Sequence, residues 1–150
     1  MSATQNKQLL QYIFAELGKG NSRPFVESMD DDFRWIVTGH TRWSRTYEGK
    51  QSVLTELFGA LRSRIAGNIT TTAHRFIAED DFVVVEARGS NTTKAGTPYN
   101  NDYCFVFRIR EGKLQEVTEY LDTELVTSAL ADPQLEQKSE NKNTVREESK

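Results

Sequence analysis

Residues 99–122 constrain the fold more than any other stretch, because they read as two long antiparallel strands joined at Glu111-Gly112. Glycine accepts positive φ and both flanks are rich in aromatic and β-branched residues, so a hairpin is predicted. In the second strand, Glu119 stands in an apolar setting between Val117 and Leu121. A buried carboxylate is costly unless it is paired or used, and Glu119 is therefore the first indication of a site.

The remaining elements follow from hydrophobic periodicity. Apolar residues at helical spacing predict helices over 5–17, after Ser22, over 50–65 and over 123–130. Alternating residues predict strands over 33–38, 69–78, 82–88, 99–109 and 114–121. Three helices in the N-terminal half, segregated from a four-strand meander, predict an α+β fold. We expect a strongly curved sheet wrapped against these helices, with a conical cavity between the two layers.

Length and composition indicate one domain, which we place at residues 1–131. Residues 132–150 are strongly polar, with few aliphatic side chains, and predict a disordered tail. The net charge of −3 argues against nucleic acid as a partner. No apolar run reaches membrane length and no signal-peptide core is visible, so we expect a cytoplasmic protein without a membrane partner.

Motifs for metal and nucleotide chemistry are missing from the sequence. The two histidines, His40 and His74, do not have the spacing of a metal site. No glycine-rich phosphate loop follows a predicted strand. The single cysteine, Cys104, lies in mid-strand and is interpreted as a small buried hydrophobe. We therefore expect neither a metal nor a cofactor.

Two segments carry a family resemblance. The run from Tyr99 to Leu114 followed by Glu119-Tyr-Leu-Asp122, and the segment Tyr47-Glu-Gly-Lys-Gln-Ser-Val53, resemble SnoaL-like proteins. These belong to the nuclear transport factor two-like superfamily, together with ketosteroid isomerases, limonene-epoxide hydrolases and polyketide cyclases. The resemblance spans about residues 5–131 and implies a cone-shaped, cystatin-like α+β barrel. It also implies a hydrophobic pocket at the wide end and a homodimer formed through the sheet face.

The same resemblance implies which strand residues face the pocket: Trp35, Val37, Val84, Glu86, Arg88, Asn101, Tyr103, Phe105 and Glu119. Limonene-epoxide hydrolases use two carboxylates bridged by an arginine. By that analogy, Glu119 and Glu86 form an acid/base pair and Arg88 is their electrostatic partner, although Glu86 and Arg88 stand here in reversed order. Asn101 and Tyr103 are the expected hydrogen-bond donors to a substrate oxygen.

Several of these residues have a structural interpretation as well. Glu86 and Arg88 can form a structural ion pair instead of a catalytic one. Trp35 and Trp43 either pack inside the cone or line its mouth. Asp122 is a candidate ligand contact, but the preferred interpretation is a helix N-cap. The predicted substrate contacts are Trp35, Val37, Trp43, Phe58, Asn101, Tyr103, Phe105 and Asp122.

The first functional hypothesis is therefore a cofactor-free enzyme that moves protons in a buried pocket. It would act as an isomerase, cyclase or epoxide hydrolase on a small apolar carbonyl or epoxide compound. The alternatives are a non-catalytic dimeric module that binds an apolar ligand and a protein-interaction domain. A free carboxylate in the pocket favours catalysis, because a fully bidentate Glu–Arg pair leaves no base.

Overall fold

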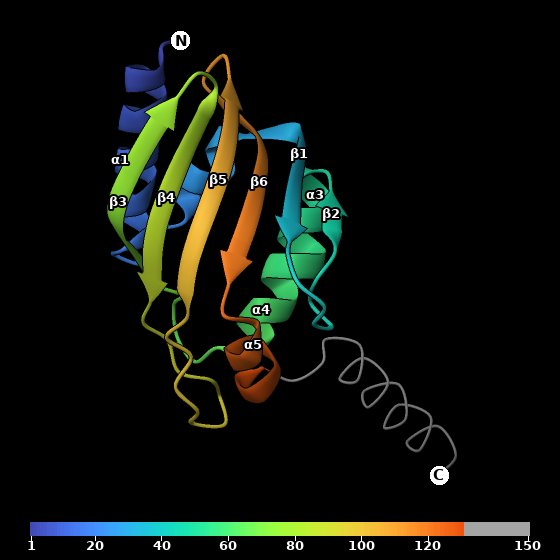
Figure 1. Cartoon of the computed structure of the whole chain (residues 1–150). Coiled ribbons are helices and arrows are strands. Elements are labelled where there is room, and N and C mark those ends of the chain that lie inside the picture. Colours follow the sequence, from blue (N-terminus) through green and yellow to red (C-terminus); the bar gives the residue numbers. More distant parts are fainter. Residues whose placement is uncertain (131–150) are drawn as a thin grey trace.

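The computed structural model describes residues 1–130 of the chain (Figure 1). The tail predicted for residues 132–150 lies outside the described residues. The first half supplies α1 (Ala3–Leu17), α2 (Arg23–Ser28), β1 (Met29–Val37), β2 (Thr46–Glu48), α3 (Lys50–Ser52), the π-helix η1 (Val53–Phe58) and α4 (Gly59–Arg64). The second half supplies β3 (Thr71–Glu79), β4 (Phe82–Gly89), β5 (Asp102–Arg110), β6 (Lys113–Leu121) and α5 (Thr123–Ala129).

The strands form one six-stranded mixed sheet in the order β2-β1-β6-β5-β4-β3. Strands β3 to β6 make the predicted meander, and β1 pairs with β6 in parallel. Two left-handed residues, Glu111 and Gly112, close the hairpin between β5 and β6. This turn matches the right-handed twist of the strands, so the sequence prediction of a hairpin is confirmed.

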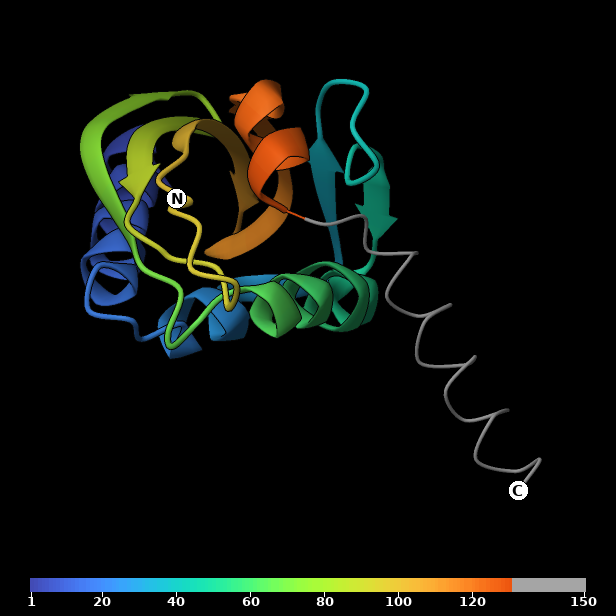
Figure 2. The same ribbon diagram turned by 90° about the horizontal axis from the view of Figure 1, so that it is seen from below.

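The N-terminal helices lie against one face of the curled sheet. Figure 2 shows the sheet bent around, with α1, α2 and α4 along its open side. Helix α1 begins with a capping box between Ser2 and Gln5 and buries Leu10, Ile13 and Phe14. The predicted α+β cone, with N-terminal helices covering a curved sheet, is confirmed.

The helix predicted over residues 50–65 is helical throughout but is not a uniform α-helix. Between Val53 and Phe58 it winds as a π-helix, and the Gly59 N–H donates to the Leu54 carbonyl five residues earlier. A π turn widens the helix and shifts the facing of its side chains, which is frequent at functional sites. The consecutive residues Leu57 and Phe58 consequently both reach the space under the sheet.

Candidate functional site

A cavity of about 310 Å³ lies between the helices and the concave face of the sheet. Six of its eighteen lining residues are Phe or Trp, namely Phe14 from α1, Phe25 from α2, Trp35 from β1, Phe58 from η1, and Phe105 and Phe107 from β5. The rings meet at centroid distances of 5.3 to 6.1 Å, many of them edge to face. The volume falls within the range of small-molecule pockets, at its lower end.

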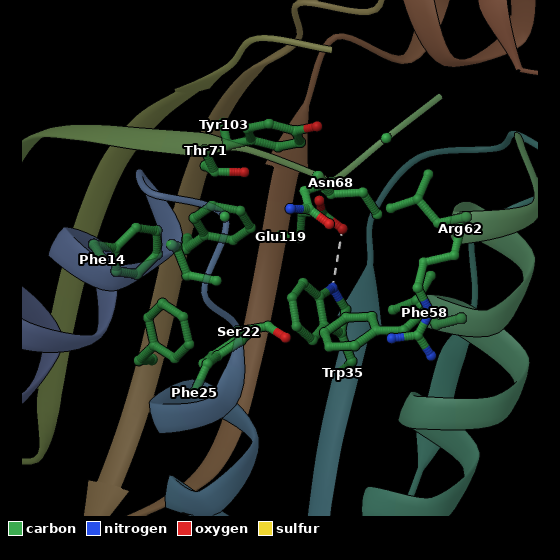
Figure 3. A pocket seen from close by; sticks show the side chains of 18 residues that line it. Phe14, Ser22, Phe25, Trp35, Phe58, Arg62, Asn68, Thr71, Tyr103 and Glu119 are labelled. Carbon is green, nitrogen blue, oxygen red and sulfur yellow. Dashed lines mark hydrogen bonds between the residues drawn. The ribbon is translucent and has the colours of Figure 1, made fainter. Parts of the chain in front are cut away.

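Glu119 on β6 is the carboxylate of this cavity. The indole Nε1–H of Trp35 donates a 2.9 Å hydrogen bond to its Oε1 (Figure 3). The parallel pairing of β1 with β6 explains this contact, because Val37 stands opposite Glu119 and Trp35 stands opposite Val117. Trp35 and Glu119 are therefore diagonal neighbours on the same face of the sheet.

The electrostatic setting of Glu119 favours the protonated form. Its side chain is only 8% exposed, and burial raises the pKa from 4.5 to about 7, although the Trp35 bond opposes this shift. Among the described residues, no cationic side chain forms an ion pair with Glu119. None of these residues donates a hydrogen bond to the second carboxylate oxygen, Oε2. A carboxyl group with a pKa near neutrality and a free oxygen can take up and release a proton.

Tyr103 on β5 also lines the cavity and stacks on Phe105 at 5.1 Å between ring centroids. Burial, followed by the influence of Tyr99 and Glu119, holds the pKa of Tyr103 well above its ordinary value of 10. The phenol therefore keeps its proton at neutral pH. The Tyr103 hydroxyl forms a side-chain hydrogen bond with Tyr99, so Tyr103 is a donor in the same cavity as Glu119 for which a ligand competes with Tyr99.

The inward position predicted for Glu86 and Arg88 is wrong. On β4 the fully buried residues are Val83, Val85 and Ala87, so the alternate set, which begins at Val84, faces outward. Glu86 pairs with Arg75 at 3.2 Å and lies 3.8 Å from His74, and Arg88 lies 3.8 Å from Asp102. Charged side chains stay on the outer face because inward burial would cost their hydration. The carboxylate–arginine–carboxylate set is not assembled.

Asn101 and Asp122 have structural positions outside the cavity lining. Both amide hydrogens of the fully buried Asn101 are used, by Tyr99 Oη at 3.2 Å and the Asp122 carbonyl at 3.1 Å. The Asp122 N–H donates to Asn101 Oδ1 at 3.0 Å, so no amide donor is left for a substrate. The Asp122 carboxylate accepts from the Glu124 and Leu125 N–H groups, which is the predicted N-cap.

Val37 and Trp43 are buried but do not line the cavity either. Val37 packs in the core, and the Arg64 guanidinium lies 5.9 Å from the centre of the Trp43 ring. The predicted contacts that do line the cavity are Trp35, Phe58, Tyr103 and Phe105, together with Glu119.

Several lining residues belong to the apolar stripes whose spacing predicts the helices. Phe14, Phe25, Leu57 and Leu61 follow this helical spacing, but the stripes end at a cavity instead of a packed sheet. The polar lining residues Arg62, Asn68 and Ser22 carried no periodic signal. Only the tertiary arrangement brings them together.

Residues 1–130, the part of the chain that the structure describes, contain neither a cluster of metal-ligating side chains nor a helix that could span a membrane. No three His, Cys, Asp or Glu side chains in that part cluster closely enough to hold a metal ion. None of its helices is both long and apolar enough to cross a membrane.

Known proteins of similar sequence or structure share this architecture. A family model described as SnoaL-like domain matches residues 10–117. No curated protein matches the sequence. A solved NTF2-like protein from Burkholderia thailandensis E264 superposes with a TM-score of 0.73 and 19% identity over 87% of this chain and 99% of its own.

Two further solved structures were obtained with a small molecule. TerC co-crystallised with polyporic acid has a TM-score of 0.70 and 20% identity, over 83% of this chain and 96% of its own. A protein of ketosteroid isomerase-like fold from Catenulispora acidiphila DSM 44928, in complex with trimethylamine, has a TM-score of 0.65 and 16% identity, over 81% of this chain and 90% of its own. At these identities the likeness shows the fold alone.

Proposed function

The chain belongs to the SnoaL-like domain family, and from this premise we propose that it is a cofactor-free acid/base catalyst acting on a small apolar carbonyl compound. The observation that carries the proposal is Glu119, a carboxyl group with a pKa of about 7 in an aromatic cavity, with no cation to hold it ionised among the described residues. A general base works best when its pKa lies close to the working pH.

The proposed step is proton transfer next to the carbonyl group. Glu119 takes a proton from the adjacent carbon, and the released electron pair forms an enolate. The enolate oxygen accepts a hydrogen bond from the Tyr103 O–H, which is the one of the two expected donors, Asn101 and Tyr103, that lines the cavity. Return of the proton from Glu119 to a different carbon completes an isomerisation and restores the carboxylate. Attack of the enolate carbon on a second carbonyl gives a cyclisation instead; the oxygen of that carbonyl becomes an alkoxide, takes the proton from Glu119 and so restores the carboxylate.

The ligand class follows from the cavity wall. The Phe and Trp side chains of the wall pack edge to face with one another. A wall of such rings favours aromatic or fused-ring ligands. A similarly folded protein, TerC, was co-crystallised with polyporic acid, so polyporic acid itself is a suitable additional probe here. Epoxide hydrolysis has less support, because the second carboxylate and the arginine of that chemistry face outward.

A thermal-shift and turnover screen with anthraquinones, steroids and terpene epoxides tests the proposal. A ligand should stabilise both wild type and Glu119→Gln, whereas only wild type should turn it over. The matched control is Glu116→Gln, which makes the same change on the opposite face of β6, where Glu116 pairs with Arg34 at 3.3 Å. Equal turnover by wild type and Glu119→Gln removes Glu119 as the base. Binding without any turnover favours the non-catalytic ligand module.

We further propose that the outer sheet face forms a homodimer. Paired positions on four neighbouring strands line up as Ile77, Val84, Val106 and Thr118, which is a largely apolar row on an outer face. Ile77 is 53% exposed, and exposed apolar rows of this kind are typical of interfaces. Analytical ultracentrifugation should show a dimer for wild type and a monomer for Val106→Arg. A wild-type monomer at tens of micromolar would contradict this assembly.

A further inference from the structure

Two charged side chains line the cavity, and the proposed reaction uses only one of them. Glu119 lies in the interior, while Arg62 on α4 is solvent-exposed and contributes to the lining from the helix side (Figure 3). The Arg62 guanidinium forms no ion pair with any described residue. Its one described hydrogen bond, to the Leu54 carbonyl, is long at 3.5 Å. An arginine of this kind keeps most of its donors available to a ligand.

Two further polar side chains join Arg62 in the lining. Ser22 precedes α2 but makes no capping hydrogen bond with its hydroxyl. Asn68 lies against Gly20, where an added Cβ would come within 3.2 Å of the Asn68 Cβ and 3.4 Å of its Nδ2. Gly20, which has a positive φ, therefore leaves room for the Asn68 amide beside the cavity. The set Arg62, Asn68 and Ser22 offers guanidinium, amide and hydroxyl donors, and it contains no carboxylate.

We propose that Arg62, in a cavity lining that also carries the Asn68 and Ser22 donors, recognises an acidic oxygen group on the ligand, so that the substrate is an apolar acid and not a neutral hydrocarbon-like compound. This inference rests on the proposed function of the cavity. A planar guanidinium matches a carboxylate or a similar ionised oxygen pair. The apolar body then lies among the Phe rings, with its acidic end at Arg62 and its reacting carbon at Glu119. Arg62 is a specificity residue in this arrangement and takes no part in proton transfer.

The test uses two probes of the same shape, anthracene-9-carboxylate and anthracene-9-carboxamide, titrated by fluorescence at pH 6. At this pH Glu119 is mostly protonated and does not repel the anion. Wild type should bind the carboxylate about fivefold more tightly than the amide, as expected for one exposed charge pair. Arg62→Gln should remove this preference and leave the amide affinity unchanged. Arg110→Gln, which removes an equal charge outside the cavity lining, should retain it.

Each other outcome overturns the inference in a recognisable way. If wild type binds the two probes equally, or if Arg62→Gln keeps the preference, then Arg62 does not recognise the acid, although the proposed function stands. If neither probe binds wild type or any variant, the cavity does not accept apolar ligands, and the proposed function falls together with the inference. A preference lost equally in Arg62→Gln and Arg110→Gln reflects only net charge and also overturns the assignment.

Discussion

Replacing Glu119 by Gln should change how the stability of the protein depends on pH. The buried carboxyl has a pKa of about 7 in the folded chain, against an ordinary value of 4.5. Between these two values the unfolded chain has lost the proton and the folded chain still holds it, so stability falls as the pH rises. The contribution of Glu119 is fully present below pH 4.5 and is lost as the pH passes through about 7.

The size of this effect follows from the two pKa values. At about 1.4 kcal/mol per pH unit, the interval corresponds to a loss of about 3 kcal/mol in the free energy of unfolding. Gln keeps the shape and can still accept the Trp35 Nε1–H bond, but it carries no charge at any pH. Relative to wild type, Glu119→Gln should therefore become more stable by about 3 kcal/mol on going from pH 4.5 to pH 8.

Urea unfolding followed by tryptophan fluorescence, at half-unit steps from pH 4.5 to 8, measures this difference. The comparison cancels the other titrating groups, which both proteins share. Glu116→Gln, on the outer face of β6, should track wild type to within about 1 kcal/mol, as befits a partly exposed ion pair. If the Glu119→Gln and wild-type curves stay parallel within about 0.5 kcal/mol, the carboxyl is hydrated in solution and the argument for a raised pKa fails.

Three further outcomes follow from the same geometry. In the urea assay, Phe105→Ala should lower the free energy of unfolding by about 2–3 kcal/mol, because the Phe105 ring lines a cavity. Phe33 is fully buried, so Phe33→Ala should lower the same free energy by about 3–5 kcal/mol. Asp122→Ala removes the α5 cap and should cost about 1 kcal/mol, seen as a lower thermal midpoint; an unchanged midpoint would show that the cap contributes nothing. Glu86→Gln and Arg88→Gln should each leave the ligand affinity, measured by titration, within about twofold of wild type. A larger loss of affinity would show that the substituted residue contributes to the binding site.

Periodicity predicted the elements of this fold well. Apolar spacing placed the first helix to within two residues of its observed start at Ala3, and the Glu111-Gly112 turn was readable from local chemistry. The π turn at Val53–Phe58 was not readable, because its residues have ordinary helix patterning. The cavity wall could not be predicted from the sequence either. An apolar helix stripe that faces a cavity and one that faces a packed sheet have the same sequence period.

The error on β4 has a different origin. Its own alternation is clear, with Val83, Val85 and Ala87 on one face and Glu86 and Arg88 on the other. Period-two patterning alone predicts that the apolar set is buried, and the structure agrees with it. Analogy to epoxide hydrolases placed the charged set inward instead. Local patterning was therefore the more reliable guide for this strand than a distant catalytic resemblance.

The pairing of β1 with β6 is the feature that creates the site, and no local pattern contains it. The two strands are separated by residues 38–112, half of the chain, and they run in parallel although the rest of the sheet is antiparallel. A register slip of one residue in β6 would turn Glu119 to the outer face and leave the Trp35 indole N–H unpaired in an aromatic wall. The observed register instead uses the only indole donor in the cavity lining to orient one carboxylate oxygen and leaves the other open to a ligand. The acid/base chemistry proposed for this chain thus depends on a long-range strand pairing as much as on the identity of Glu119.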